Sequence, residues 1–291
     1  MRFLLLFFVF LSACSSYKIK GPAGFIQIKG SDTLVNVVQY LAEEFMKKNP
    51  YIFVAVTGGG SGVGIASLIN KTTDIADASR RMKKKEIEMA KKRGVNPYEI
   101  VVGYDGIAVI VNKNNPVDKL TIKQLHDIYT GKITNWKELG GEDLKIVALS
   151  REVSSGTHLY FKEHVVELGK KTKDEFASSV LMFSSNQAIV EEVTSNEQAI
   201  GYIGMGYLNE RVKAVALARK ENSPYVYPTT EEVLAKKYPL SRPLYMYTNG
   251  APKGIIKKFI DFVLSKEGQM IFKRIGFVPR IIDKNVEAKN N

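Results

Sequence analysis

Three segments of this 291-residue chain combine glycine and hydroxyl residues with the start of an expected helix. They cover residues 30–34, 57–64 and 151–157, and each follows an expected strand. The first turn of a helix has N–H groups without acceptors and carries the positive end of the helix dipole. Such a segment is therefore a ready site for an anion. The groups that can contact an anion there belong to Ser31, Asp32, Thr33, Leu34, Gly60, Ser61, Arg151, Ser155, Gly156 and Thr157.

The segment 57–64 has five glycines in the seven positions from Gly58 to Gly64. Glycine has no Cβ, so the backbone can approach a ligand closely. No Gly-Lys-Ser/Thr follows, which excludes a Walker loop, and the glycine spacing does not fit the Rossmann fingerprint. A nucleophile elbow centred on Ser61 would need glycine where Val63 stands. A tight turn is the alternative, but the glycines exceed what a turn needs and favour ligand contact.

Arg151 gives the third segment a planar guanidinium group, which can bind two oxyanion oxygens at once. The hydroxyls of Ser155 and Thr157 and the Gly156 amide can serve the remaining oxygens. A capped helix beside a surface arginine explains this segment equally well. Simple N-capping is the better explanation of residues 30–34 when that segment is taken alone.

Residues 74–81 form a fourth candidate segment, which contains Ser79, Arg80 and Arg81. Taken alone, the two arginines are better explained as a solvated face. The chain as a whole is basic, with 42 Lys and Arg against 30 Asp and Glu, a net charge of +12 and a pI near 9.5. This charge favours nucleic acid, anionic lipid or small oxyanions as partners. The basic residues are spread along the chain without interleaved aromatics, so we expect no nucleic-acid binding.

The cysteine and histidine content restricts the chemistry. Cys14 is the only cysteine, which excludes an intramolecular disulfide and a cysteine-built zinc site. The three histidines, His126, His158 and His164, all fall in helical patterns and form no ligand cluster. We therefore expect no metal, no cofactor and no enzyme activity; a secreted phosphatase is the weaker alternative.

The N-terminus predicts export. A basic Arg2, an apolar run over residues 3–11 and small residues before Cys14 are typical of a signal peptide, here residues 1–13. The run is too short to span a bilayer. Residues 11–14 resemble a bacterial lipobox, in which Cys14 is acylated and anchors the protein to the membrane. Residues 14–24 would then be the tether; an ordinary signal peptide with an incidental cysteine is the alternative.

Strand and helix patterns alternate along the rest of the chain, which predicts an α/β fold with largely parallel sheets. Leu34, Val37, Val38, Leu41 and Phe45 show helical spacing. Further helices are expected at 63–70, 83–93, 122–129 with Thr121 as cap, 157–168, 187–195 and around 256–263. Strands are expected at 25–29, 52–56, 74–76, 107–111, 146–149, 200–203, 212–217 and 244–248.

Together these segments resemble the substrate-binding proteins of bacterial high-affinity phosphate ABC transporters, the PstS family. Residues 30–33 and 60–62 resemble the family's first two phosphate loops, and 74–80 its segment ending in Ser-Arg. Residues 151–157, with Arg151 and Ser155-Gly156-Thr157, resemble its most diagnostic motif. Residues 131–136 and 199–202 match as well. The resemblance covers about residues 25–279, with the motifs in the family's order.

The resemblance implies a two-lobed fold like that of periplasmic binding proteins, with the ligand in the cleft between the lobes. One lobe would hold residues 25–106 and 241–291, the other 107–240, and strands at 107–111 and 244–248 would cross between them. It also implies that a monomeric, exported and lipid-anchored protein binds inorganic phosphate by hinge closure. An ABC permease and its ATPase would be the partners.

Carried over by position, Thr33 and the Leu34 amide would bind phosphate from the first segment, together with Ser31. Ser61 and Ser79 would add hydroxyls, and Arg151, Ser155, Gly156 and Thr157 would bind from the other lobe; Asp32, Gly60 and Arg80 are secondary candidates.

Some members of the family have an aspartate where Ser79 stands, and it accepts the proton of monohydrogen phosphate. Asp32 or Asp77 can take that role here. A binder of sulfate, molybdate or another oxyanion is therefore the alternative within the same class.

Overall fold

The computed structural model describes residues 23–280. The predicted signal peptide, Cys14, most of the tether and the last residues of the C-terminal tail lie outside this range. Within it, no helix combines the length and the apolar content needed to cross a bilayer.

The first part of the chain alternates strands and helices and ends in a long strand. Its elements are β1 (Gly24–Gly30), α1 (Asp32–Lys48), β2 (Ile52–Thr57), α2 (Ser61–Ile69), β3 (Ile75–Ala78), α3 (Lys84–Lys92) and β4 (Pro97–Asn112).

The middle part contains shorter strands and helices. They are β5 (Lys119–Thr121), α4 (Ile122–Tyr129), η1 (Trp136–Leu139), β6 (Val147–Arg151), α5 (Gly156–Phe161), η2 (Lys162–Val166), β7 (Leu181–Phe183), α6 (Asn186–Ser195), β8 (Ala199–Gly204), η3 (Met205–Tyr207), β9 (Val212–Ala214), β10 (Ala216–Ala218) and α7 (Thr230–Leu234). The last part consists of β11 (Ser241–Asn249), α8 (Gly254–Leu264), α9 (Lys266–Arg274) and β12 (Val278–Pro279).

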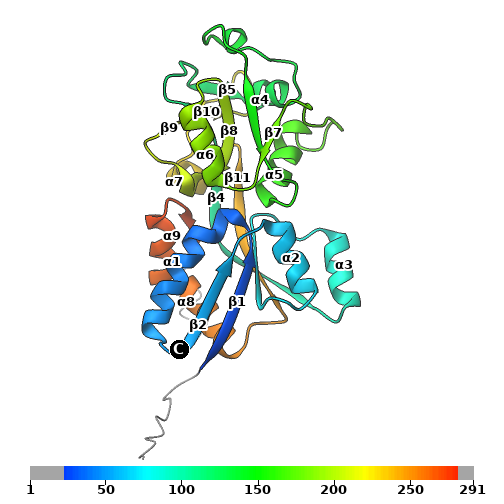
Figure 1. The fold of residues 1–291 in the computed structure, drawn as a ribbon, viewed down its shortest axis with the longest axis vertical. Coiled ribbons are helices and arrows are strands. Elements are labelled where there is room, and N and C mark those ends of the chain that lie inside the picture. Colours follow the sequence, from blue (N-terminus) through cyan, green and yellow to red (C-terminus); the bar gives the residue numbers. More distant parts are fainter. Residues whose placement is uncertain (1–22, 281–291) are drawn as a thin grey trace, which may run out of the picture.

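The elements form two groups joined by β4 and β11 (Figure 1). One group holds β1–β3 with α1–α3, α8 and α9, and the other holds α4–α7 with β5–β10. The strands follow the order β2-β1-β3-β11-β4-β8-β6-β7. The first half of β4 pairs with β11, and the second half pairs with β8 and β9. The long strand β4 therefore belongs to the sheets of both groups.

Hydrophobic periodicity accounts for the main elements. The apolar stripe of α1 is buried against the sheet, and Phe45 meets Phe259 of α8 edge to face at 5.2 Å between ring centroids. Thr121 caps α4 as predicted, since its side chain accepts from the Gln124 amide. Burial of such stripes removes apolar surface from water and favours this arrangement.

The α/β fold is confirmed, but its sheets are more mixed than expected. Strands within each group pair in parallel, as β1 does with β2 and β3, and β6 with β7 and β8. The antiparallel pairs between the described strands all involve β4 or β11. A strand that passes from one group to the other and a strand that returns run in opposite directions, so the antiparallel pairing follows from the two crossings.

Some predicted elements differ in the structure. The strand predicted at 107–111 is the second half of β4, which begins at Pro97. Residues 212–217 form two strands instead of one, because the Val215 amide donates to Val109 and the next amide donates to Asp118, so the chain changes its pairing partner. The helix predicted at 157–168 is α5 followed by one π-helical turn, η2. None of these differences moves the candidate segments away from the ends of their strands.

Candidate anion-binding site

The candidate segments lie at the carboxyl ends of strands. Residues 31–34 follow β1, Ser79 follows β3, and residues 155–157 come four residues after β6. Ser61 and Gly156 are the first residues of α2 and α5, so their N–H groups have no acceptor within the helix. The carboxyl ends of strands in open α/β sheets are the usual location of ligand sites.

Hydroxyl groups from both groups of elements meet at this place. Thr33 Oγ1 of α1 lies 2.9 Å from Thr157 Oγ1 of α5. Ser61 Oγ accepts from the Ser79 amide at 3.0 Å and lies 3.3 Å from Ser79 Oγ. All four residues are at most 1% exposed. The sequence therefore predicted four hydroxyl residues that the structure brings into one buried cluster.

Two glycines allow this close approach. A Cβ on Gly156 would lie 2.4 Å from Ser61 Oγ and 2.6 Å from Ser79 Oγ. A Cβ on Gly60, whose φ is 94°, would lie 2.7 Å from the Ser154 carbonyl oxygen. No real Cβ contact is that short, so larger residues would push the two groups apart. The glycine-rich segment thus serves to let backbone from the two groups approach each other.

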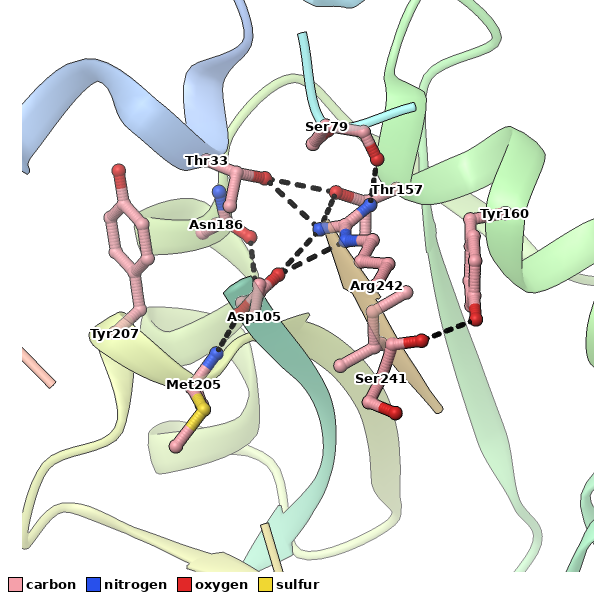
Figure 2. Close-up of polar contacts among 12 residues, drawn as sticks. Thr33, Ser79, Asp105, Thr157, Tyr160, Asn186, Met205, Tyr207, Ser241 and Arg242 are labelled. Carbon is pink, nitrogen blue, oxygen red and sulfur yellow. Dashed lines mark hydrogen bonds and ion pairs between the residues drawn. The ribbon is translucent and has the colours of Figure 1, made fainter. Parts of the chain in front are cut away.

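Arg242 of β11 is the centre of the cluster (Figure 2). Its Nη2 donates to Thr157 Oγ1 at 2.9 Å and approaches Thr33 Oγ1 at 3.5 Å, and its Nη1 donates to the Ser79 carbonyl at 3.0 Å. The same guanidinium donates to Asp105 of β4 through Nε at 3.1 Å and Nη2 at 2.7 Å. One side chain on a crossing strand thus contacts three of the four hydroxyl residues.

Asp105 and Arg242 form a buried ion pair between the two crossing strands. They are directly opposite in the β4–β11 register and are 0% and 2% exposed. Burial raises the pKa of Asp105, while Arg242 and the Met205 amide, which donates to Oδ1 at 3.0 Å, oppose this effect. Our sequence analysis missed both residues. The available signal was that Asp105 precedes the apolar strand predicted at 107–111 and Arg242 precedes the one predicted at 244–248, because a charge that becomes buried needs a partner.

Arg151 approaches the cluster through Asp32. Its Nη2 lies 3.2 Å from Asp32 Oδ2 and donates to the Ser184 carbonyl at 2.8 Å, while Nε donates to the Phe183 carbonyl at 3.3 Å. Among residues 23–280, Nη1 has no acceptor although it is buried. Burial lowers the pKa of Arg151, and Asp32 partly offsets this effect. A buried guanidinium N–H without an acceptor is a donor available to an anion.

Asn186 is a third residue that the sequence analysis did not single out. Its side-chain Nδ2 and backbone N–H donate to Asp32 Oδ2 at 2.6 and 2.9 Å, and its Oδ1 accepts from the Gly204 amide at 3.1 Å. Tyr207 Oη donates to the Asp32 carbonyl at 2.7 Å. Asp32 thus connects the start of α1 to the opposite group of elements, whereas an ordinary helix cap bonds only to its own helix.

Ser31, Leu34 and Ser155 differ in whether their polar groups already have partners within the protein. Ser31 is 1% exposed and its side chain does not cap α1, which argues against the capping alternative for that segment. The Leu34 amide already donates to the Ser31 carbonyl at 3.0 Å. Ser155 Oγ does cap α5, accepting from the Thr157 and His158 amides. The structure therefore supports the helix-cap alternative for Ser155, which the sequence analysis left open.

Arg80 differs from the solvated face that its sequence context suggested. Its side chain is 9% exposed and forms two hydrogen bonds to Glu86, at 2.7 and 2.8 Å. Arg81, in contrast, is 68% exposed and pairs with Glu99, so the solvated interpretation fits it. Asp77, the other proposed proton acceptor, is buried, and Oδ1 has no partner among residues 23–280. Burial raises the pKa of Asp77 well above its ordinary value.

A second polar network lies behind the Arg151 segment. Ser150 Oγ lies 2.7 Å from Tyr202 Oη and 3.1 Å from His158 Nδ1, and the Arg151 amide donates to Tyr202 Oη at 3.4 Å. Burial lowers the pKa of His158 to about 4. Ser150 and His158 are 0% and 4% exposed, so this network packs behind the Arg151 segment and supports it.

Arg242 and Arg151 each have a carboxylate partner. Asp105 pairs with Arg242, and Asp32 pairs with Arg151. Within the described part of the chain, no group of three or more His, Cys, Asp or Glu residues is placed to hold a metal ion. The arrangement offers an anion hydroxyls, helix N-termini and the Nη1 of Arg151, which is the chemistry of oxyanion recognition.

Comparison with known proteins agrees with this chemistry. The family model described as the PBP superfamily domain matches residues 17–267. The phosphate-binding protein PstS of Pseudomonas aeruginosa is 32% identical over 279 residues, which covers 90% of this chain and 85% of that protein. The PstS of Borreliella burgdorferi is 31% identical and covers 94% of this chain and 97% of its own. The chain belongs to the PstS family.

Solved structures of relatives have the same fold. A structure from Clostridium perfringens, described as a phosphate ABC transporter substrate-binding protein with bound phosphate, is 38% identical with a TM-score of 0.79. It covers 88% of this chain and 100% of that chain. An ABC-type phosphate transport receptor from Vibrio cholerae is 33% identical with a TM-score of 0.69, again covering 88% of this chain and all of its own. These PstS-like relatives are named as binding and transport proteins.

Proposed function

We propose that this protein binds inorganic phosphate outside the cytoplasm and delivers it to an ABC-type permease. The observation that carries the proposal is the buried cluster in which Thr33, Ser61, Ser79 and Thr157 meet around Arg242. It lies at strand ends and helix starts, where an oxyanion is favoured. The names of the PstS relatives and the bound phosphate in the Clostridium perfringens structure support phosphate as the anion.

The charge of a buried phosphate must be balanced by hydrogen bonds. Burial of a doubly charged anion is costly unless each oxygen has donors. The four hydroxyls, the N1 amides of α2 and α5, and Arg151 Nη1 are donors that full charges do not already occupy. We infer that these groups replace the water shell of the ion.

We propose that the two groups of elements act as the lobes predicted from the sequence, residues 25–106 with 241–291 and residues 107–240. Thr33–Thr157, Asp32–Asn186 and Gly62–Ser154 are contacts between them. Because β4 and β11 are the strands that run between the groups, rotation about them would open the site. Release of phosphate to the permease then requires breaking these contacts.

We also propose that the protein acts as a monomer anchored through acylated Cys14, and that it has no catalytic role. The names of the relatives, which are binding and transport proteins, support the last point. Mass spectrometry of the membrane-bound protein checks the anchor. A Cys14→Ser variant should be released in soluble form.

Calorimetric titration with phosphate and sulfate tests the function directly. We expect phosphate to bind and sulfate to compete weakly, because a carboxylate such as that of Asp32 or Asp77 can accept a hydrogen bond from monohydrogen phosphate, whereas sulfate has no proton to donate and is repelled. Equal competition by sulfate over pH 5–8 would reassign the protein to another oxyanion. Release of phosphate from a model ester would instead favour a phosphatase.

A further inference from the structure

A pocket of about 330 Å³ borders the anion-binding site, and its lining includes Ser79 and Arg242 of the cluster. We call this pocket the vestibule. The two groups of elements line it from opposite sides, with residues 79–83 and 242–245 on one side and residues 159–170 of α5, η2 and the following loop on the other. Its position between the groups, next to two residues of the cluster, makes it a route for a small solute to the site.

The lining of the vestibule is strongly basic. It contains one acid, Glu163, and five lysine or arginine residues: Arg80, Arg81, Lys83, Lys170 and Arg242. Four of the five basic residues have carboxylate partners: Arg80 pairs with Glu86, Arg81 with Glu99, Arg242 with Asp105, and Lys170 with Glu163. The carboxylates of Glu86, Glu99 and Asp105 belong to side chains outside the lining.

Lys83 differs from the other four. Within residues 23–280 its ammonium group has no carboxylate within ion-pair distance. Burial lowers the pKa of Lys83 and the positive charge of Arg80 lowers it further, while Glu86 and Glu163 partly offset both effects. An ammonium group that is partly removed from water beside another cation, without a counter-ion of its own, attracts a mobile anion.

The wall opposite Lys83 is fixed in place. The rings of Tyr160 and His164 stack at 3.8 Å between centroids and 12° between planes. Tyr160 Oη donates to the Ser241 carbonyl at 2.7 Å (Figure 2), and the Arg242 guanidinium lies 5.8 Å from the Tyr160 ring centre. The vestibule therefore has one rigid aromatic wall and one basic wall, and Glu163 is its single acid.

We propose that the vestibule is an outer anion site, in which Lys83 holds a small hydrated oxyanion such as phosphate before the ion enters the buried site, while Glu163 limits this attraction by neutralising Lys170. The inference rests on the proposed phosphate-binding function. We expect the outer site to change the rate at which phosphate associates with the protein, because charges at the edge of a binding site act mainly on the encounter with the ligand.

Two single variants change the charge of the vestibule in opposite directions. Lys83→Gln removes the one ammonium group of the lining that has no carboxylate partner in the described part of the chain. Glu163→Gln removes the carboxylate partner of Lys170. A unit charge several ångströms from a dianion in water changes the local concentration of that dianion by about fivefold. We expect phosphate to associate about fivefold more slowly with Lys83→Gln and severalfold faster with Glu163→Gln at low ionic strength.

The rate of association of ³²P-phosphate is measured by rapid mixing and filtration at 10 mM and at 1 M salt. Both differences should vanish at 1 M salt, where screening reduces the range of a charge to about 3 Å. Lys258→Gln and Glu210→Gln are matched controls, since both residues are exposed and neither lines the vestibule. They should leave the rate within a factor of about 1.5 of the unchanged protein.

Equal rates for the unchanged protein and both vestibule variants at low salt would overturn the inference. So would effects of the same size in the two controls, because the attraction would then belong to the net charge and not to this pocket. If the unchanged protein fails to bind phosphate at all, the proposed function fails instead, and that result is separate from either of these.

Discussion

Arg151 and Arg242 are both buried at the candidate anion-binding site, yet their guanidinium groups have different partners. Arg242 donates to Asp105, to the Ser79 carbonyl and to Thr157, and thereby connects the crossing strands to both groups of elements. Arg151 is held by Asp32 and two carbonyls but keeps Nη1 without an acceptor in the described part of the chain. We infer that Arg242 mainly holds the site together and that Arg151 is the arginine available to the ligand.

The largest expected effect is the loss of stability on removal of Arg242. The Arg242→Met change leaves Asp105 buried without its partner, which should lower the free energy of unfolding by about 3–5 kcal/mol. Urea unfolding measures the change. The double variant Arg242→Met/Asp105→Asn should recover part of the loss, because the uncompensated charge is gone; no recovery would mean that the ion pair does not account for the loss.

Removal of Arg151 should act on binding more than on folding. The Arg151→Ala change should reduce the free energy of phosphate binding by about 3 kcal/mol, which raises Kd roughly a hundredfold, because the charge of the anion is left unmatched. Calorimetry gives the Kd, with the exposed Arg211→Ala as control. If Kd is unchanged, the difference inferred between the two arginines is wrong.

The network behind the Arg151 segment should make stability depend on pH. The pKa of His158 is about 4 in the folded protein and about 6.5 when unfolded. Between these values only the unfolded chain binds the proton at His158, so this residue alone makes stability fall as the pH is lowered from 6.5 towards 4, by about 1.4 kcal/mol per pH unit, while the raised pKa values of Asp77 and Asp105 act in the opposite direction. Denaturation at several pH values measures the slope, and His158→Gln should flatten it.

The smallest expected effects are the losses of stability on replacement of Thr157 and Thr33, and their order separates the two residues. Thr157 Oγ1 accepts from Arg242 at 2.9 Å, whereas Thr33 Oγ1 lies 3.5 Å from the same nitrogen. Hydrogen bonds to charged groups contribute more than neutral ones, so Thr157→Val should cost about 1.5–2 kcal/mol of stability and Thr33→Val about 1 kcal/mol. Thermal unfolding in the absence of phosphate ranks the two variants. The reverse order would mean that Arg242 does not depend on Thr157.

Local sequence patterns predicted the parts of the site that lie within one segment. Glycine, serine and threonine between a strand and a helix are sufficient to predict an anion site at Thr33, Ser61 and Thr157, since helix starts supply N–H donors wherever they occur. The same patterns could not distinguish a helix cap from a ligand contact. Ser155 caps its helix and Ser31 does not, and this depends on which side chains of the other group lie nearby.

The composition, the alternation of strands and helices, and the loop chemistry came from the sequence alone, because each depends on residues close together in the chain. The pairing of Asp105 with Arg242, 137 positions apart, and of Asp32 with Asn186, 154 positions apart, was decided only by the fold. Strand register and the approach of the two groups set these contacts, and both depend on the packing of the whole core. The tertiary structure therefore decided that the Arg242 guanidinium donates to Asp105, Ser79 and Thr157, and that Arg151 keeps Nη1 without an acceptor among residues 23–280.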